Sequence, residues 1–307
     1  MSLVVRVLGS RPVATAGWSL TARRLRVLTY HRIPDPPQFA RQLDCLADLG
    51  CRTVTGDQVH TWLGGADLGR RPVWITFDDG DPTVVSAGLA ALAQRSMHAT
   101  AFVCPGLVDT DRPHWWDLVE RAANLLADVP SVGSLKQVDD QARRAVVDDL
   151  TGRLAANGAD VTARQWTTAD IHAWLAAGNE IGNHTWDHPC LDRCSVEARG
   201  VQVRAAHDRL VRLMGRAPTT FAWPNGNVAG GVQAQLGELG YRLVLRCDHR
   251  LTARTQRSED LSRLKVDSDA DLVRFRAILS GAHSGVFHLG AGLRARLQAV
   301  TRRPGLR

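Results

Sequence analysis

Two adjacent carboxylates and a pair of histidines are the residues of this sequence best suited to chemistry. Asp78 and Asp79 directly follow the apolar run 73–77, and His184 and His188 stand four residues apart farther along the chain. Such oxygens and nitrogens can bind one divalent metal, and a carboxylate beside a metal can transfer protons. Each motif alone is weak evidence, because an Asp-Asp-Gly sequence is commonly a turn after a strand.

Predicted strands precede each of these polar stretches. The run 73–77 is rich in β-branched and aromatic residues and predicts a buried strand, residues 180–182 predict a short strand before the histidines, and residues 219–222 predict another before a third polar loop, 223–226. Functional side chains gather at the carboxyl ends of the strands in a parallel α/β barrel. We therefore expect the three stretches to meet.

Alternating strand and helix patterns predict one α/β barrel domain over residues 25–290. Residues 1–24 are expected to be an irregular basic lead-in, and residues 291–307 a basic tail. Between about 109 and 165 the pattern is mainly helical and indicates an insertion between barrel units.

Composition narrows the class of protein. The 307 residues are 44% apolar and carry 38 basic against 31 acidic side chains, but the basic residues are scattered and only Lys136 and Lys265 are lysines. This distribution argues against a nucleic-acid partner. The six cysteines form no CxxC pair and are expected to be free thiols. No apolar run reaches the ~18 residues of a membrane span, so we expect a cytoplasmic protein, with residues 1–24 as a potential peripheral contact to a membrane face.

The three polar stretches resemble the ordered motifs of a known family. Residues 76–80 (Thr-Phe-Asp-Asp-Gly), 184–188 (His-Thr-Trp-Asp-His) and 221–226 (Phe-Ala-Trp-Pro-Asn-Gly) look like those of the polysaccharide deacetylases, also called carbohydrate esterase family 4 or the NodB homology domain. Residues 28–33 and 115–117 resemble the branch associated with exopolysaccharide synthesis. The resemblance implies a distorted parallel (β/α) barrel of NodB type.

The resemblance also implies a site. It assigns one divalent metal, usually zinc with cobalt, nickel or manganese as alternatives, to Asp79, His184 and His188, and it makes Asp78 the general base. A metal held by three protein ligands can lower the pKa of a bound water toward ~7, so that the water attacks an N-acetyl carbonyl. By family analogy, the backbone N–H of Asn225 and the metal would stabilise the oxyanion.

The general acid has two candidates. In most family members the general acid is a histidine near the carboxyl end, which corresponds to His288 here. Some exopolysaccharide-type members carry this histidine on an N-terminal strand instead, which corresponds to His31. We prefer His31, since a helix and a Gly-rich loop separate His288 from the last clear strand. Two family features are missing: Ala222 replaces the arginine that orients the base, and no clear Asp-x-x-Asp-Trp motif is present.

Aromatic residues near the motifs offer contacts for a sugar ring. Trp223 is the preferred one because it lies in the third motif, whereas Trp115 and Trp116 are at least as consistent with packing. The predicted substrate-binding residues are Trp223, Pro224, Asn225 and Gly226.

The best hypothesis is a metal-dependent hydrolase that removes an N-acetyl group from an amino sugar in a glycan, glycolipid or glycosylated small molecule. One alternative is a hydrolase of another non-peptide amide on the same fold. A second is a glycan-binding protein with weakened catalysis, a view that the missing arginine and fourth motif favour.

Overall fold

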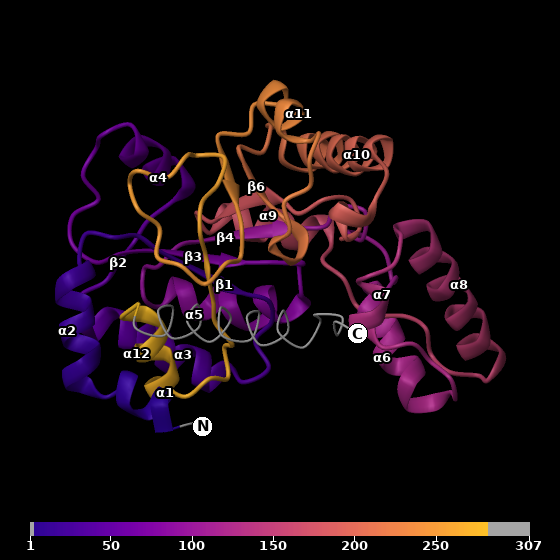
Figure 1. The fold of residues 1–307 in the computed structure, drawn as a ribbon, viewed down its shortest axis with the longest axis horizontal. Coiled ribbons are helices and arrows are strands. Elements are labelled where there is room, and N and C mark those ends of the chain that lie inside the picture. The colour runs from indigo at the N-terminus through magenta and orange to yellow at the C-terminus, as the bar shows by residue number, and fades with distance from the viewer. Residues whose placement is uncertain (1–2, 282–307) are drawn as a thin grey trace, which may run out of the picture.

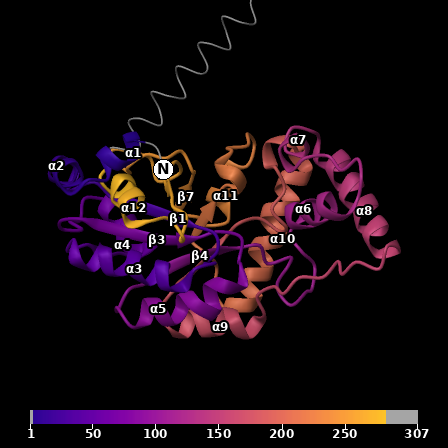
Figure 2. The same ribbon diagram turned by 90° about the horizontal axis from the view of Figure 1, so that it is seen from below.

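The computed structural model describes residues 3–281 (Figures 1 and 2). The strands are β1 (Arg26–Tyr30), β2 (Arg52–Thr53), β3 (Pro72–Phe77), β4 (Ala99–Val103), β5 (Glu180–Asn183), β6 (Thr220–Ala222), β7 (Leu243–Leu245) and β8 (Leu264–Lys265). The helices are α1 (Leu3–Leu8), α2 (Arg11–Thr21), α3 (Pro36–Asp48), α4 (Gly56–Leu63), α5 (Leu89–Ala93), α6 (Trp115–Leu125), α7 (Val132–Leu135), α8 (Asp140–Ala156), α9 (Thr168–Ala176), α10 (Val196–Met214), α11 (Gln233–Glu238) and α12 (Leu272–Leu279), with shorter turns η1 (Val84–Gly88), η2 (Leu191–Arg193) and η3 (Pro224–Gly226).

All strands belong to one parallel sheet with the order β7-β6-β5-β4-β3-β1-β8, and β2 pairs with β3 beside this path. An isolated parallel bridge between Leu245 and Leu261 links the β7 edge to the segment that leads into β8. The sheet therefore curls into an irregular, incompletely hydrogen-bonded barrel. This confirms the predicted distorted parallel (β/α) barrel.

Both faces of the central strands are covered, as the apolar runs predict. Every residue of β1, β3 and β4 is buried. Side chains such as Tyr30 and Phe77 pack outward in the larger core cluster, while Val27 and Trp74 belong to a second cluster inside the barrel. Figure 2 shows α3, α5 and α9 along one side of the strands. Parallel strands buried on both faces are typical of α/β proteins.

The amino-terminal segment is helical, so the prediction of an irregular lead-in is wrong. On α2, Ala14 and Trp18 stand four residues apart and are both buried. The guanidinium of Arg26 lies 3.8 Å from the centroid of the Trp18 ring, and its Nε donates to the Leu279 carbonyl at 2.9 Å. Arg26 of β1 thus contacts both α2 and α12, and α2 packs beside the barrel near α12 (Figure 1).

Three helices, α6, α7 and α8, lie between β4 and α9, where the sequence predicts a mainly helical insertion. Figure 1 shows them together at one side of the barrel. They have their own apolar cluster, which includes Trp115, Leu118, Leu150 and Leu154. The insertion is therefore a packed helical unit rather than a loop.

Two segments are only partly regular. Residues 261–266 form a strand only at β8, and the helical segment before β4 begins as the π-helical turn η1 and continues as α5. Among the residues that the structure describes, no helix has the length and apolar character needed to cross a bilayer.

Candidate metal centre and catalytic cavity

Asp78 and Asp79 follow β3 and are brought to one cavity by a tight turn. The backbone of Asp79 has φ = 74°, in the left-handed region, and the next residue, Gly80, has φ = 82°. This conformation is costly for a residue with a side chain and is typically maintained at functional sites. The turn breaks the alternation of the strand, so that both carboxylates lie close to His184.

The three predicted metal ligands converge. Asp79 Oδ1 lies 3.4 Å from His184 Nε2 and 3.4 Å from His188 Nε2, and the three ligand atoms all lie within 4.8 Å of one another. Asp79 Oδ1 is buried and has no hydrogen-bond partner among the described residues. Two imidazole nitrogens and a buried, unpaired carboxylate oxygen form a donor set that fits a divalent metal such as zinc.

Neighbouring groups orient the two histidines. The Nδ1 atom of His184 lies 2.8 Å from the Ala222 carbonyl, an acceptor, so Nδ1 carries the proton and Nε2 presents its lone pair to the triad. Trp115 Nε1 donates to the backbone carbonyl of His188 at 3.2 Å. His188 itself has φ = 57°, which turns its ring back toward His184, 4.8 Å away between ring centroids.

Burial and charge set the protonation of the ligands. Burial lowers the pKa of His188 to about 3 despite the opposing charge of Asp79, so this imidazole is neutral. Burial opposes ionisation of Asp79, yet His188 and His184 hold the pKa of its carboxyl well below the usual value. Burial lowers the pKa of His184, but the negative charges of Asp78 and Asp79 outweigh this effect, so its pKa is raised above the usual value. Acid would therefore compete with a metal ion for the His184 nitrogen.

Arg263 holds Asp78, and the sequence analysis did not identify it. Its two terminal nitrogens donate to the two oxygens of Asp78 at 2.7 and 2.8 Å, and the arginine side chain is fully buried. Burial raises the pKa of Asp78, but the charge of Arg263, helped by His184, holds it below its usual value. Arg263 is one of two basic residues in the mixed stretch 261–266 (Leu-Ser-Arg-Leu-Lys-Val), and its burial, which implies a charged partner, is visible only in the structure.

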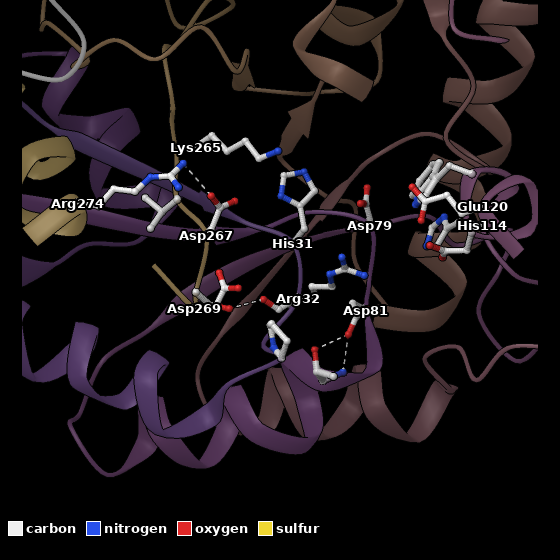
Figure 3. Close-up of a pocket in the computed structure, with 16 residues that line it drawn as sticks. His31, Arg32, Asp79, Asp81, His114, Glu120, Lys265, Asp267, Asp269 and Arg274 are labelled. Atoms are coloured by element: carbon white, nitrogen blue, oxygen red, sulfur yellow. Dashed lines mark hydrogen bonds and ion pairs between the residues drawn. The ribbon is translucent and has the colours of Figure 1, made fainter. Parts of the chain in front are cut away.

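His31 lies where the preferred acid is expected. It follows β1, whose Tyr30 is in register with Phe77 of β3, so His31 and Asp78 follow neighbouring strand ends. With Asp79 it lines a cavity of about 830 Å³ (Figure 3). His288 lies outside the described residues.

The prediction that Trp223 contacts substrate is wrong. Its side chain is 1% exposed and packs on Phe221, with 5.1 Å between ring centroids. The two residues keep the alternation of β6, so both face the same apolar cluster. Trp116 instead lines the cavity, stacked on His114 at 4.4 Å and edge-on to His188 at 4.6 Å.

The remaining residues of the third motif lie beside the site without lining this cavity. Asn225 has φ = 56°, and its side-chain oxygen accepts a hydrogen bond from Lys136 Nζ at 2.6 Å. Pro224 is buried, and Gly226 is half-buried against Cys247. Direct substrate contact by Pro224, Asn225 and Gly226 stays a prediction. All six cysteines are free thiols.

The helical insertion also supports the loop 184–188 through Asp187, which lies between His184 and His188 in the sequence. Arg144 of α8 binds the Asp187 carboxylate through two hydrogen bonds of 2.8 and 2.9 Å, and its Nε donates to Asp140 at 2.7 Å. Gln202 Nε2 also donates to Asp187 at 2.9 Å. Because this pairing is bidentate, it fixes the orientation of the Asp187 carboxylate as well as its distance from Arg144. The loop between the histidines is therefore attached to both α8 and α10.

Replacing Arg144 by methionine should weaken zinc binding by about 10–100-fold, because groups that orient metal ligands typically contribute that much to affinity. Competition of the apoprotein with a chromophoric chelator measures the dissociation constant. Arg153→Met is the matched control, because Arg153 is also on α8 but its side chain donates hydrogen bonds, within the described part of the chain, only to Asp149 and the Ala127 carbonyl. Equal zinc affinities of the two variants would contradict this role.

Comparisons with known proteins agree with this geometry. The sequence profile described as "Polysaccharide deacetylase" matches residues 65–244, which is more than half of the chain. The peptidoglycan-N-acetylmuramic acid deacetylase PdaC of Bacillus subtilis (strain 168) is 36% identical over 62 residues, covering 20% of this chain and 13% of PdaC. A chitin deacetylase of Colletotrichum lindemuthianum is 34% identical over 74 residues, covering 24% of this chain and 30% of that protein. This chain thus aligns with less than a third of either relative.

Solved structures share the fold over a larger part of the chain. The deacetylase PplD of Streptococcus pyogenes, solved in complex with acetate, has a TM-score of 0.61 at 16% identity, covering 84% of this chain and 99% of that one. IcaB of Ammonifex degensii has a TM-score of 0.60 at 20% identity, with coverage of 84% and 97%. The profile match, which includes the two aspartates and both ligand histidines, shows that this chain belongs to the polysaccharide deacetylase family.

Proposed function

We propose that this protein is a metal-dependent N-deacetylase that hydrolyses the acetamido group of an amino sugar in a glycan, glycolipid or glycosylated small molecule. One observation carries the proposal. Asp78 is an ionised carboxylate, fixed by Arg263 directly beside a convergent Asp79, His184 and His188 triad. A base next to three metal ligands is the arrangement that metal-assisted amide hydrolysis requires.

Asp79, His184 and His188 would hold the metal. Two nitrogens and one carboxylate oxygen are a donor set that zinc accepts, with cobalt, nickel and manganese as alternatives. When bound at three protein ligands, such an ion lowers the pKa of a water molecule and polarises a carbonyl oxygen.

Asp78 and His31 would move the protons. Asp78 is ionised at neutral pH and accepts the proton of the attacking water, while Arg263 keeps its carboxylate in place. His31 lines the same cavity as Asp79, from the neighbouring strand end, and would deliver a proton to the departing amine. This transfer is needed because a protonated amine is the better leaving group.

Removal of the metal should abolish acetate release. Dialysis of the protein against a chelator should reduce turnover of N-acetylglucosamine oligosaccharides to background, and stoichiometric zinc should restore it, because the triad alone supplies no activated water. A coupled assay for free acetate measures the rate. Full turnover by metal-free protein, or no acetate from any N-acetylated sugar with metal present, would overturn the proposal.

A further inference from the structure

The wall of the cavity formed by α6 carries two carboxylates without partners. Asp117 and Glu120 stand three residues apart on α6, so they share one face of the helix, and both line the cavity. Among the described residues, neither makes a hydrogen bond or an ion pair. Burial, followed by the charge of Glu120, raises the pKa of Asp117 to about 6. The pair is a concentration of negative charge without a direct ion pair among the described residues, in which Glu120 is exposed and Asp117 is half-buried.

A buried histidine beside this pair also lacks a partner. His114, the residue before α6, is 7% exposed and lines the cavity, and neither of its ring nitrogens has a hydrogen-bond partner among the described residues. Burial lowers the pKa of His114, so the ring is neutral and offers one acceptor nitrogen. Buried polar atoms are normally paired, so an unpaired ring at a cavity wall indicates a ligand contact. Stacking on Trp116 fixes the ring.

The cavity is asymmetric in charge. Figure 3 shows Asp267 and Arg274 at one end, His114 and Glu120 at the other, and Asp79 with His31 between them. At the first end Asp267 is neutralised by Arg274, 3.0 Å away, and Asp269 is exposed to solvent. At the α6 end, Arg32 acts on Asp117 only at longer range.

A second metal ion is a poorer occupant of the α6 end than an organic cation. Among the described residues, the only group of three or more His, Cys, Asp or Glu side chains with convergent ligand atoms is Asp79, His184 and His188. Asp117 and Glu120 are instead spread along one face of α6. An ammonium group on a sugar ring has three N–H donors that point in different directions, so it can be bound by acceptors that do not converge on one point.

We propose that the α6 wall, formed by His114, Trp116, Asp117 and Glu120, binds an ammonium group of the substrate, so that the preferred substrate carries a free amine near the acetamido group that is hydrolysed. This inference rests on the proposed function and specifies its substrate class. The substrate is a partly deacetylated amino-sugar chain or another glycoside with a free amine. In a partly deacetylated chain, that amine is the product of a preceding N-deacetylation, by this protein or another.

Two trisaccharides test the inference: fully N-acetylated chitotriose, and the same trisaccharide with one free amine. We expect the metal-loaded protein to have about a tenfold higher kcat/KM for the amine-bearing substrate, a typical effect of a hydrogen-bonded charge pair. The double variant Asp117→Asn, Glu120→Gln should bring the ratio of the two kcat/KM values near one. Asp269→Asn, which removes a charge from the exposed Asp269 of the same cavity, should change the ratio by no more than about twofold.

A binding measurement separates failure of the inference from failure of the proposed function. Titration calorimetry with fully deacetylated chitotriose should show affinity about tenfold weaker for the double variant than for the parent. Acetate release without preference for the amine-bearing substrate, or equal binding by parent and double variant, would overturn the inference. Tight binding of the deacetylated sugar with no acetate release from either substrate would overturn the proposed function while supporting the amine subsite.

Discussion

Replacing Arg263 by methionine should lower the free energy of unfolding by about 3–5 kcal/mol and remove most of the deacetylase activity. The guanidinium is fully buried and binds both oxygens of Asp78, so its loss leaves a buried carboxylate without a counter-charge. The methionine side chain has a volume similar to that of arginine, so the substitution leaves little empty space at position 263. Urea denaturation and acetate release measure the two effects.

The pH profile distinguishes a positioning role of Arg263 from a purely structural one. Without Arg263, only the charges of His184 and His31 oppose the effect of burial, which raises the pKa of Asp78, so the acidic limb of the kcat/KM profile should move to higher pH. Arg263→Lys should restore part of the stability but less of the activity, because one ammonium cannot form both hydrogen bonds. The double variant Arg263→Met, Asp78→Asn should regain stability without activity. An unshifted acidic limb in Arg263→Met would contradict this role.

Replacing Asp78 by asparagine should lower kcat by about 10²–10⁴-fold, the usual contribution of a general base. An amide has nearly the same shape but does not accept the proton. Asp78 is not among the three convergent ligands, so the variant should bind zinc nearly as tightly as the parent. Single-turnover acetate release and zinc content measure the two properties.

The adjacent variant Asp79→Asn provides the control for this prediction. It should lose both zinc and activity, because Asp79 Oδ1 lies 3.4 Å from both ligand nitrogens. The two aspartates would thus be separated by function although they are neighbours in sequence. Loss of zinc in Asp78→Asn, or retention of zinc in Asp79→Asn, would contradict the assignment.

Local sequence was sufficient to predict the metal triad and the fold but not what holds the base. Asp79 follows β3, whose apolar run is visible in the sequence, and the two histidines follow the short strand β5 (Glu-Ile-Gly-Asn). Parallel strands bring these two strand ends together. Arg263 lies 185 residues from Asp78 and belongs to a stretch with only two residues in regular strand pairing. No local pattern relates two such positions.

Trp223 illustrates the opposite error, in which a correct motif suggests a wrong contact. Its neighbours predict a loop at the site, but the side chain continues the alternation of β6 and is buried beside Phe221. Local sequence gives no reason to prefer Trp116 to Trp223 as a substrate contact, because the position of Trp116 beside His188 depends on how α6 packs against the barrel. The amino-terminal helices were also not predicted, because Arg6 and Arg11 interrupt the apolar residues there, although Arg6 belongs to α1 and Arg11 begins α2.

The strand order also determines when the site becomes complete during protein synthesis. Strand β8, which Arg263 precedes, pairs with β1, the first strand of the sheet. All three metal ligands and Asp78 leave the ribosome before Arg263 does, since chains are made from the amino terminus. An unfinished chain therefore lacks the arginine that binds Asp78. Under the proposed mechanism, the chain would become competent for catalysis only after β8, the last of the described strands, has been made and has paired with β1.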